Sequence, residues 1–359
     1  MNLPKPIKFE VERYVGGLSQ FKKIENPIKL SANESALGAS PKAIEAFEKE
    51  KNKLFKYPED DSNSLREVLS NKFKIDSKKI ICGSGSDQIF DLTCRLFLNP
   101  DDEVIVTEFG FIMYKIYASL SRAKVVLAKE KNFKASVEEI IKKVSDKTKI
   151  VFIANPNNPT GTYLSKKEML DLRKKLRSDI LLVVDDAYFE FINSDNFSSG
   201  LDLFKDSANV LVTRTFSKIY GLAGLRLGWG YSSKQIIDSM YQIKPPFNVN
   251  RAVLAAGVAA IKDSEWTKKA IDHNTLWSKK IFSMLKEYNI KTNEPAVNFF
   301  LMNFDETKIN SDEAFEKLAA DKLIVRKMTQ YKIPNSLRLT IGNKEANENF
   351  IKSMGSILK

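Results

Sequence analysis

The sequence predicts an α/β protein with a large domain on a mainly parallel sheet and a smaller C-terminal α+β domain. Two observations support this prediction. Across residues 79–231, short apolar runs alternate with amphipathic segments, and such alternation is typical of a parallel sheet covered by helices. After about Asn250 the pattern changes to long helical stretches and isolated strands. We expect an N-terminal arm over residues 1–28, a large domain over 29–250 and a small domain over 251–359.

Six apolar runs in the large domain are predicted to be buried strands, because they are short, apolar and separated by helical patterns. They cover residues 80–81, 104–106, 124–127, 150–153, 180–184 and 210–212. Ligands of parallel α/β sheets bind beyond the carboxyl ends of the strands. The residues that follow each strand are therefore the first candidates for a functional site.

The small domain is predicted from a helical stretch that runs through VLAAGVAAI toward Tyr288, followed by a strand at residues 299–302. A helix near residues 314–320, strands around Ile324 and Leu339, and a final helix complete it. The first residues of the chain have Pro and Gly punctuation and little periodicity, which indicates an arm.

Composition excludes several classes of protein. With 43% hydrophobic and 28% charged residues, the chain is expected to be globular. No segment has the apolar core of a secretory signal or the ~18 apolar residues of a membrane span, so we expect a cytoplasmic protein without a membrane partner. Cys82 and Cys94 are the only cysteines, too few for a disulfide framework. The net charge of +12 comes mostly from scattered Lys, which indicates a solvated surface and no nucleic-acid partner.

The single histidine, His273, excludes further chemistry. A Ser-His-Asp hydrolase would depend on this one residue, and no GxSxG motif accompanies it. A metal site built on several His or Cys ligands is excluded by scarcity, so no metal is expected.

Two loops that follow predicted strands contain polar side chains in rigid settings. The segment Gly83-Ser84-Gly85-Ser86-Asp87-Gln88 opens a helix, and the free N–H groups of such a start bind anions such as phosphate. An ordinary helix start capped by Ser86 would have the same pattern. The segment NPNNPTG, residues 155–161, makes a turn whose prolines and glycine hold Asn side chains such as Asn158 outward.

Two further loops contain acidic and basic residues. Asp185, Asp186 and Tyr188 follow the strand LLVVD; a carboxylate at that position is costly unless it is paired, and a protonated heterocyclic nitrogen would be a suitable partner. A helix-start Asp is the alternative for either residue alone. Lys218 and Arg226 follow the strand VLVTR in an apolar, glycine-rich loop. A lysine that is desolvated near cations has a lowered pKa and becomes a nucleophile able to form a Schiff base.

Together these groups match what pyridoxal 5′-phosphate (PLP) requires. Its phosphate would contact the Gly/Ser helix start and the donors of the last loop. The individual assignments are Thr215, Ser217 and Arg226 to the phosphate, Asp185 to the ring nitrogen, Asn158 and Tyr188 to the phenolic oxygen, and Lys218 to the aldehyde.

The order of NPNNPTG, DDAYFEF and TFSKIYGLAGLRLG resembles fold-type-I PLP aminotransferases, and within them the histidinol-phosphate aminotransferase family. The resemblance extends from about Tyr14 to Gly342. The motif around Lys218 is highly specific for PLP, and the terminal motifs are moderately specific for the substrate. These terminal motifs are Tyr14-Val15-Gly16-Gly17, Ser31-Ala32-Asn33-Glu34, Tyr57-Pro58, Ile324-Val325-Arg326 and Leu337-Arg338.

The resemblance implies a role for each motif residue. Lys218 would hold the cofactor and shuttle protons, Ser86 and Asp87 would join the phosphate site, and Phe111 would stack on the ring. Tyr57 would reach the cofactor of a neighbouring subunit, which implies a homodimer with shared sites. The residues implied for the anionic end of the substrate are Arg326 and Arg338, with Tyr14 and Asn33 as neutral helpers.

The implied reaction is transamination between histidinol phosphate and 2-oxoglutarate in histidine biosynthesis. An aromatic amino-acid aminotransferase is the closest alternative, because Arg338 alone can hold a carboxylate while Arg326 stays at the surface. A PLP decarboxylase of an amino-acid phosphate would share most of the motifs. A nucleotide-binding or nucleic-acid-binding protein is disfavoured, because GSGSDQ is not GxGxxG, no Walker lysine follows, and Lys218 would be unexplained.

The sequence departs from the family pattern at two places. The stretch Phe109-Gly110-Phe111-Ile112-Met113-Tyr114 lacks the proline of the usual Pro-x-Tyr-x-x-Tyr, and Phe111 occupies the stacking position. The motif around Asn33 also lacks its usual proline. Neither departure affects the chemistry of Lys218. Both weaken the match to the histidinol-phosphate aminotransferase pattern within the larger family.

Overall fold

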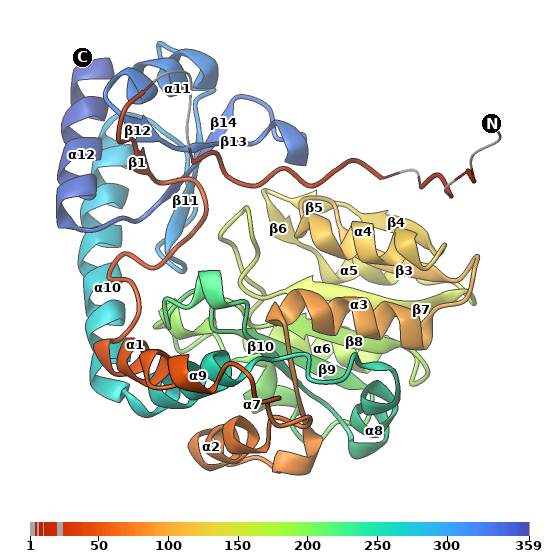
Figure 1. Ribbon diagram of the computed structural model, residues 1–359. Helices are drawn as coiled ribbons and strands as arrows, with labels where there is room; N and C mark the ends of the chain where they lie inside the picture. The colour runs from red at the N-terminus through yellow and green to blue at the C-terminus, as the bar shows by residue number, and fades with distance from the viewer. Residues whose placement is uncertain (1–3, 6, 10, 20–23, 359) are drawn as a thin grey trace.

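The computed structural model describes residues 4–5, 7–9, 11–19 and 24–358, so the predicted arm lies partly outside the described residues (Figure 1). Its largest element is a seven-stranded sheet in the order β2-β10-β9-β8-β7-β3-β4. The strands are β2 (Ile80–Gly83), β10 (Gly228–Tyr231), β9 (Val210–Thr215), β8 (Leu181–Asp185), β7 (Thr148–Ala154), β3 (Glu103–Thr107) and β4 (Lys124–Ala128). All six predicted strands are present, and the predicted α/β class is confirmed.

The prediction missed β10, which runs antiparallel between β2 and β9. Its sequence, GWGY, has favourable aromatic residues, but its two glycines weaken the strand signal. Because β10 is antiparallel to both neighbours, β2 and β9 still run in the same direction. The loops after β2, β7, β8 and β9 therefore meet at one edge of the sheet, which we call the carboxyl edge.

Both faces of the sheet are covered, because successive strand residues point to opposite faces. In β7, Val151 and Ile153 belong to one core cluster, whereas Ile150 and Phe152 belong to another. The helices that pack on the two faces or follow the sheet are α1 (Pro41–Glu48), α2 (Asn63–Phe73), α3 (Gly85–Phe97), α4 (Ile112–Leu120), α5 (Val137–Ile141), α6 (Lys166–Lys175), α7 (Gly200–Phe204), α8 (Lys234–Ile243) and α9 (Arg251–Lys262). A short hairpin, β5 (Glu130–Lys131) with β6 (Lys134–Ala135), follows β4.

The C-terminal part has its own antiparallel sheet, in the order β11-β14-β13, and its own core around Phe300, Phe315 and Phe350. Its elements are α10 (Ser264–Glu287), β11 (Phe299–Asn303), α11 (Ser311–Ala320), β12 (Leu323–Ile324), β13 (Arg326–Lys327), β14 (Ser336–Thr340) and α12 (Lys344–Leu358). Figure 1 shows these elements side by side, with the long α10 extending from beside α12 down to α1 and α9.

Two details differ from the sequence prediction. The single helical stretch expected toward Tyr288 is two helices, α9 and α10, separated at Asp263, whose side chain accepts a hydrogen bond from the backbone N–H of Trp266 at 3.4 Å. The chain also contributes to the C-terminal part before it enters the large sheet. There β1 (Ile28–Lys29) pairs with β12, and Leu30 packs into the C-terminal core.

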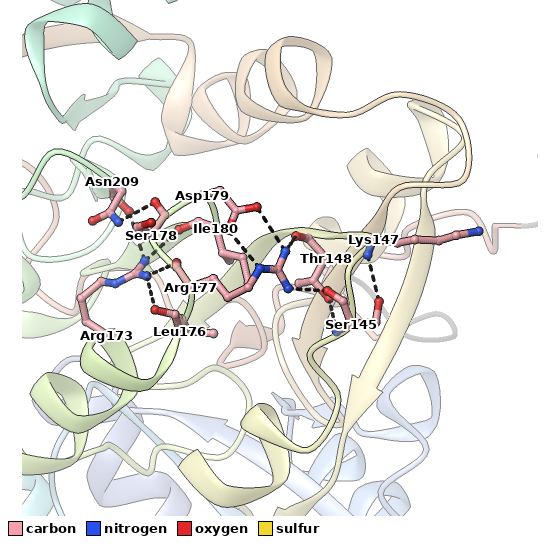
Figure 2. Close-up of polar contacts among 10 residues, drawn as sticks. All are labelled: Ser145, Lys147, Thr148, Arg173, Leu176, Arg177, Ser178, Asp179, Ile180 and Asn209. Atoms are coloured by element: carbon pink, nitrogen blue, oxygen red, sulfur yellow. Dashed lines mark hydrogen bonds and ion pairs between the residues drawn. The ribbon is translucent and has the colours of Figure 1, made fainter.

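The opposite edge of the large sheet, which we call the amino edge, is held by two arginines (Figure 2). Arg173, on α6, donates from Nη1 to the carbonyl of Ile180 at 2.8 Å and from Nη2 to that of Arg177 at 2.6 Å. Arg177 donates to the carbonyls of Ser145 at 2.6 Å and Thr148 at 3.3 Å. These bonds tie the starts of β7 and β8 to the end of α6. Among the described helices, none is long and apolar enough to cross a membrane.

Candidate active site

A cavity of about 600 Å³ opens at the carboxyl edge of the large sheet, between its loops and the strands β13 and β14. Every predicted site residue except Tyr57 lines it. The lining residues are Tyr14, Asn33, Ser86, Asp87, Phe111, Asn158, Asp185, Tyr188, Thr215, Ser217, Lys218, Arg226, Arg326 and Arg338. The fold thus brings together motifs that lie more than 300 residues apart in the chain.

A second cavity, of about 760 Å³, lies between the β5–β6 hairpin and β11. It is the larger of the two, but none of the predicted site residues lines it. The smaller cavity is lined by buried charged groups and by the N-terminus of α3. The larger one is lined by amides, hydroxyls and exposed charged side chains. We therefore place the chemistry in the smaller cavity.

One end of the cavity is suited to an anion. Arg226 contacts Asp87 (Nη2 to Oδ2, 3.1 Å) and donates from Nη1 to the Ser217 hydroxyl at 3.1 Å. The first turn of α3 lies close to this cluster, because two glycines permit a close approach. A Cβ on Gly85, whose φ is +76°, would lie 2.5 Å from Arg226 Nη2, and one on Gly228 would lie 2.3 Å from the Ser86 backbone nitrogen. A helix start with an arginine and hydroxyl donors is an arrangement that binds phosphate.

Lys218 occupies the middle of the cavity. Its Nζ lies 3.4 Å from the carbonyl oxygen of Ala32 and 5.5 Å from the centre of the Tyr188 ring. Burial, followed by the charges of Arg338 and Arg226, lowers the pKa of Lys218 to about 8. A substantial fraction of this amine is therefore neutral and nucleophilic at a mildly alkaline pH.

The two adjacent aspartates have different environments. Asp185 accepts hydrogen bonds from the Tyr114 hydroxyl at 2.7 Å and from the Thr213 hydroxyl at 3.2 Å, and its side chain faces the cavity. Burial raises the pKa of Asp185 to about 7, while these two hydrogen bonds lower it. A carboxyl group in this setting is stabilised in its ionised form by a cationic partner, such as a protonated ring nitrogen.

Asp186 points away from the cavity, so it is the structural member of the pair. It contacts Arg214 at 3.4 Å and accepts hydrogen bonds from the backbone N–H groups of Gly200 and Leu201 at the start of α7. This helix-start arrangement is the alternative that the sequence left open for either aspartate. The structure assigns it to Asp186.

The phenolic and amide side chains form a network with the arginines. Tyr188 accepts a hydrogen bond from the Asn33 amide at 3.0 Å. Asn158 accepts one from Arg338 through its Oδ1, which leaves its NH₂ group to donate into the cavity. Arg338 also donates to the Ser31 carbonyl at 3.0 Å, and its buried Nε has no hydrogen-bond partner among the described residues. A buried donor without a partner is a natural contact for an anionic ligand.

Arg326 and Arg338 are direct partners in the pairing of β13 with β14. Their side chains are 7% and 2% exposed, so the alternative that places Arg326 at the surface is wrong. Arg326 donates to the carbonyl of Val15 at 2.8 Å, and its guanidinium lies 5.7 Å from the Tyr14 ring centre. Burial and the neighbouring Arg326 charge lower the pKa of Arg338 to about 10. Two buried like charges repel, and an anion between them would relieve that cost.

Tyr57 is the one predicted residue that the fold does not bring to this cavity. Its side chain is 78% exposed and stacks on Phe247, with ring centres 4.5 Å apart. The neighbouring Leu54 and Phe55 are also exposed. These residues form an apolar surface outside the cavity.

Sequence reasoning did not assign a role to Tyr114 or Thr213. Tyr114 is the last residue of the FGFIMY stretch, but no local pattern indicates its contact with Asp185, which is 71 residues away in the sequence. Thr213 is the register partner of Asp185 in the pairing of β9 with β8. An alignment of the two predicted strands at their carboxyl ends would have identified it.

The cavity residues fit PLP: an anion site, a reactive amine and a buried carboxylate lie in one cavity with amide and phenol donors. The comparisons with known proteins agree with this chemistry. Residues 25–354 match the family model for aminotransferase class I and II, and the chain belongs to that family. It is therefore a PLP-dependent aminotransferase, as predicted.

Individual relatives narrow the family further. The chain is 51% identical to the histidinol-phosphate aminotransferase of Pelagibacter ubique and 39% identical to that of Maricaulis maris, with 99% of each chain covered in both cases. Within the family, it belongs with the histidinol-phosphate aminotransferases, which confirms the resemblance seen in the motifs.

Solved structures show the same fold. The histidinol-phosphate aminotransferase of Sinorhizobium meliloti in complex with pyridoxal-5′-phosphate superposes with a TM-score of 0.84 at 21% identity, over 92% of this chain and 90% of that one. A putative histidinol-phosphate aminotransferase from Erwinia carotovora gives 0.86 at 21% identity, over 96% and 98% of the two chains. The predicted fold-type-I class is confirmed.

Proposed function

We propose that this enzyme transfers the amino group between histidinol phosphate and 2-oxoglutarate, giving imidazole-acetol phosphate and glutamate. The observation that carries the proposal is the pair of buried guanidinium groups, Arg326 and Arg338, on adjacent strands facing the cavity. Histidinol phosphate has no carboxylate, so its phosphate must supply the anionic contact. A dianionic phosphate suits two arginines better than a single carboxylate does. Relatives with this name, 39–51% identical, support the choice.

The cavity residues divide into those that hold the cofactor and those that hold the substrate. PLP, when bound, supplies an electron-withdrawing ring that stabilises negative charge at the substrate carbon. In the proposed arrangement Asp185 would keep the ring nitrogen protonated, Asn158 and Tyr188 would bind the phenolic oxygen, and Phe111 would pack on the ring. The proposed phosphate site consists of Ser86, Asp87, Thr215, Ser217 and Arg226.

Lys218 has two proposed tasks. Its amine would hold PLP through the cofactor's aldehyde carbon, and when the amine is free it would accept the proton that leaves the substrate Cα. Both tasks require a neutral amine, and the lowered pKa of Lys218, about 8, supplies one. Tyr14 and Asn33 line the same cavity as this amine and the two arginines, and there they would orient the substrate.

We also propose a homodimer with shared sites. The exposed apolar residues Leu54, Phe55 and Tyr57 support it, since a surface of this kind is typical of an interface. In that assembly Tyr57 would reach the partner's cofactor. The proposed compartment is the cytoplasm, in keeping with two cysteines that are buried and free. The division into an arm, a large domain and a small domain remains a prediction.

A substrate panel tests the proposed substrate. Histidinol phosphate, histidinol, phenylalanine and tyrosine would each be offered to the PLP enzyme with 2-oxoglutarate, and glutamate formation measured. Histidinol is the matched control, since it differs from histidinol phosphate only in the phosphate. We expect a kcat/KM at least about 100-fold lower with histidinol, the effect of losing charged hydrogen bonds to two arginines. Equal rates with both, or faster turnover of phenylalanine or tyrosine, would replace this proposal with an aromatic aminotransferase.

A further inference from the structure

Tyr114 is the last residue of the Phe109–Tyr114 stretch and lies behind the proposed cofactor site, and the sequence motifs assigned it no role. It is a buried residue of α4, and its hydroxyl donates to Asp185 Oδ2 at 2.7 Å. Its ring stacks on Phe152, with centres 4.8 Å apart and planes at 8°, and meets the edges of Phe90 and Phe111 at 5.1 and 5.6 Å. Three aromatic contacts therefore fix the direction in which its O–H points.

The hydroxyl of Tyr114 remains a donor throughout the working pH range. Burial and the nearby Asp185 carboxylate hold the pKa of Tyr114 well above its ordinary value. The other oxygen of the carboxyl, Asp185 Oδ1, accepts from Thr213 at 3.2 Å. An ionised carboxylate has about four acceptor positions, so each oxygen keeps a lone pair for another donor.

We propose that Tyr114, assisted by Thr213, is a positioning residue that holds the Asp185 carboxylate toward the ring nitrogen of the cofactor. The inference depends on the proposed role of Asp185 and adds the element that orients it. Without these two donors the Asp185 carboxylate could rotate about its side-chain bonds. Its orientation would then be fixed only by the single contact to the ring nitrogen. With them, the ordering is complete before the cofactor binds, which strengthens the later contact.

The same two donors favour the charged form of Asp185. Burial, Asp186 and Asp87 all raise the pKa of Asp185, and the hydrogen bonds from Tyr114 and Thr213 are what lower it. Removal of either bond raises that pKa further. Since only the ionised carboxylate pairs with a protonated ring nitrogen, the pH below which the cofactor binds weakly should then move upward.

The test is Tyr114→Phe, which removes the hydroxyl and keeps the aromatic stack. The measurement is the affinity of the apoenzyme for PLP, titrated from about pH 6 to pH 9. We expect about 10–100-fold weaker binding at neutral pH and an upward shift of the pH at which binding is half lost, as for the loss of a charge-assisted hydrogen bond. Thr213→Val should change both quantities in the same direction by less, because its bond is longer. This second variant keeps the test independent of the packing around Tyr114.

The control is Tyr231→Phe, which removes a buried tyrosine hydroxyl from the far end of β10 and should change neither quantity. An analogue of PLP with carbon in place of the ring nitrogen gives a second check, because Tyr114→Phe should not weaken its binding. Equal losses for PLP and this analogue, or weaker PLP binding with an unchanged pH profile, would mean that Tyr114 acts by packing alone and would overturn the inference.

Asp185→Ala separates this inference from the proposed function. If Asp185→Ala binds PLP poorly and Tyr114→Phe binds it normally, the role of Asp185 stands and that of Tyr114 is wrong. If Asp185→Ala itself binds PLP normally, Asp185 is not the partner of the ring nitrogen, and both the assignment and the inference fail.

Discussion

Two pairs of arginines, at opposite edges of the molecule, use their donors in opposite ways. At the amino edge, Arg173 and Arg177 direct their guanidinium groups at backbone carbonyls and at the carboxylate of Asp179 (Figure 2). At the carboxyl edge, Arg326 has one hydrogen bond among the described residues, to the carbonyl of Val15, and Arg338 keeps a buried Nε without a partner.

The difference separates an arginine that holds the fold from one that binds a ligand. The amino-edge guanidinium groups donate to partners within the chain, and the bonds of Arg177 to Ser145 and Thr148 join segments that lie about 30 residues apart. The carboxyl-edge arginines are more deeply buried and less satisfied, and they repel each other, so the folded chain carries an electrostatic cost there. An anionic ligand bound between the two arginines would remove that cost. Changes at the carboxyl edge should therefore reduce activity and spare stability, and changes at the amino edge should do the reverse.

The largest expected effect is that of Lys218→Ala. It should lower transamination by about 10⁴-fold or more, because the covalent contact and the proton transfer are both lost. The folded pKa of Lys218, about 8, is below its unfolded value of 10.5, so this residue lowers the stability of the apoenzyme at neutral pH, and this effect is lost progressively as the pH rises from about 8 to 10.5. The variant apoenzyme should thus melt at the same or a higher temperature at pH 7. In the wild type, borohydride should fix PLP on Lys218, and a label on another lysine would contradict the assignment.

The adjacent aspartates allow the comparison to be made within one dipeptide. Asp185→Asn should lower kcat by about 10²–10³-fold, since the ring nitrogen loses its charged partner, with little change in the melting temperature. Asp186→Asn should leave turnover within about threefold and lower the free energy of unfolding by about 2–4 kcal/mol, because Arg214 loses its buried counter-charge. Steady-state kinetics measures turnover, and urea unfolding measures the free energy of unfolding. Near-normal turnover in Asp185→Asn would require the two residues to exchange roles.

Local patterns predicted most of the fold because the buried strands of a parallel sheet are continuous apolar runs. The strand Gly228–Tyr231 was missed because its sequence is not a continuous apolar run. It is buried by the strands on either side of it, and not by any local pattern of its own. The break at Asp263 was missed as well, since it depends on a side-chain cap that also bonds to Ser40, far away in the sequence. Contacts between distant segments are what the local pattern does not contain.

The same limit applied at the site. The loops after each strand were identified because the direction of the strands brings them to one edge. The bond between Arg338 and Asn158, by contrast, joins residues 180 positions apart, and it changes the interpretation of Asn158. The amide that the sequence assigned to the cofactor alone also bonds to Arg338, the arginine proposed for the substrate. The burial of Arg326, which supports the proposal of histidinol phosphate, depends on the pairing of β13 with β14 and on the N-terminal segment that it contacts.

Arg326→Ala tests the carboxyl-edge pair directly and should have an intermediate effect. We expect kcat/KM for histidinol phosphate to fall by roughly 10–100-fold, which corresponds to one charged hydrogen bond. The loss with phenylalanine or tyrosine should be much smaller, if these are accepted, because Arg338 alone can hold a carboxylate. Stability should be unchanged or slightly raised, since a like-charge repulsion is removed. Equal losses on both kinds of substrate, or none on either, would remove the case for histidinol phosphate.

The smallest effect on activity is expected at the amino edge. A loss of activity there would contradict the distinction between arginines that stabilise the fold and arginines that bind a ligand. Arg173→Ala removes the donors that bind the carbonyls of Leu176, Arg177, Ile180 and Asn209.

Water can reach some of these carbonyls in the half-buried setting of Arg173, so we expect a loss of about 1–3 kcal/mol in the free energy of unfolding and not the sum of several bonds. Lys175→Ala is the matched control on the same helix: its ion pair with Asp171, at 2.8 Å, is exposed on both sides and should contribute less than about 0.5 kcal/mol. Both variants should keep kcat/KM within about twofold at a temperature where they are folded. If Arg173→Ala lowered activity as much as Arg326→Ala while its unfolding curve stayed unchanged, the satisfaction of donors would not distinguish the two pairs.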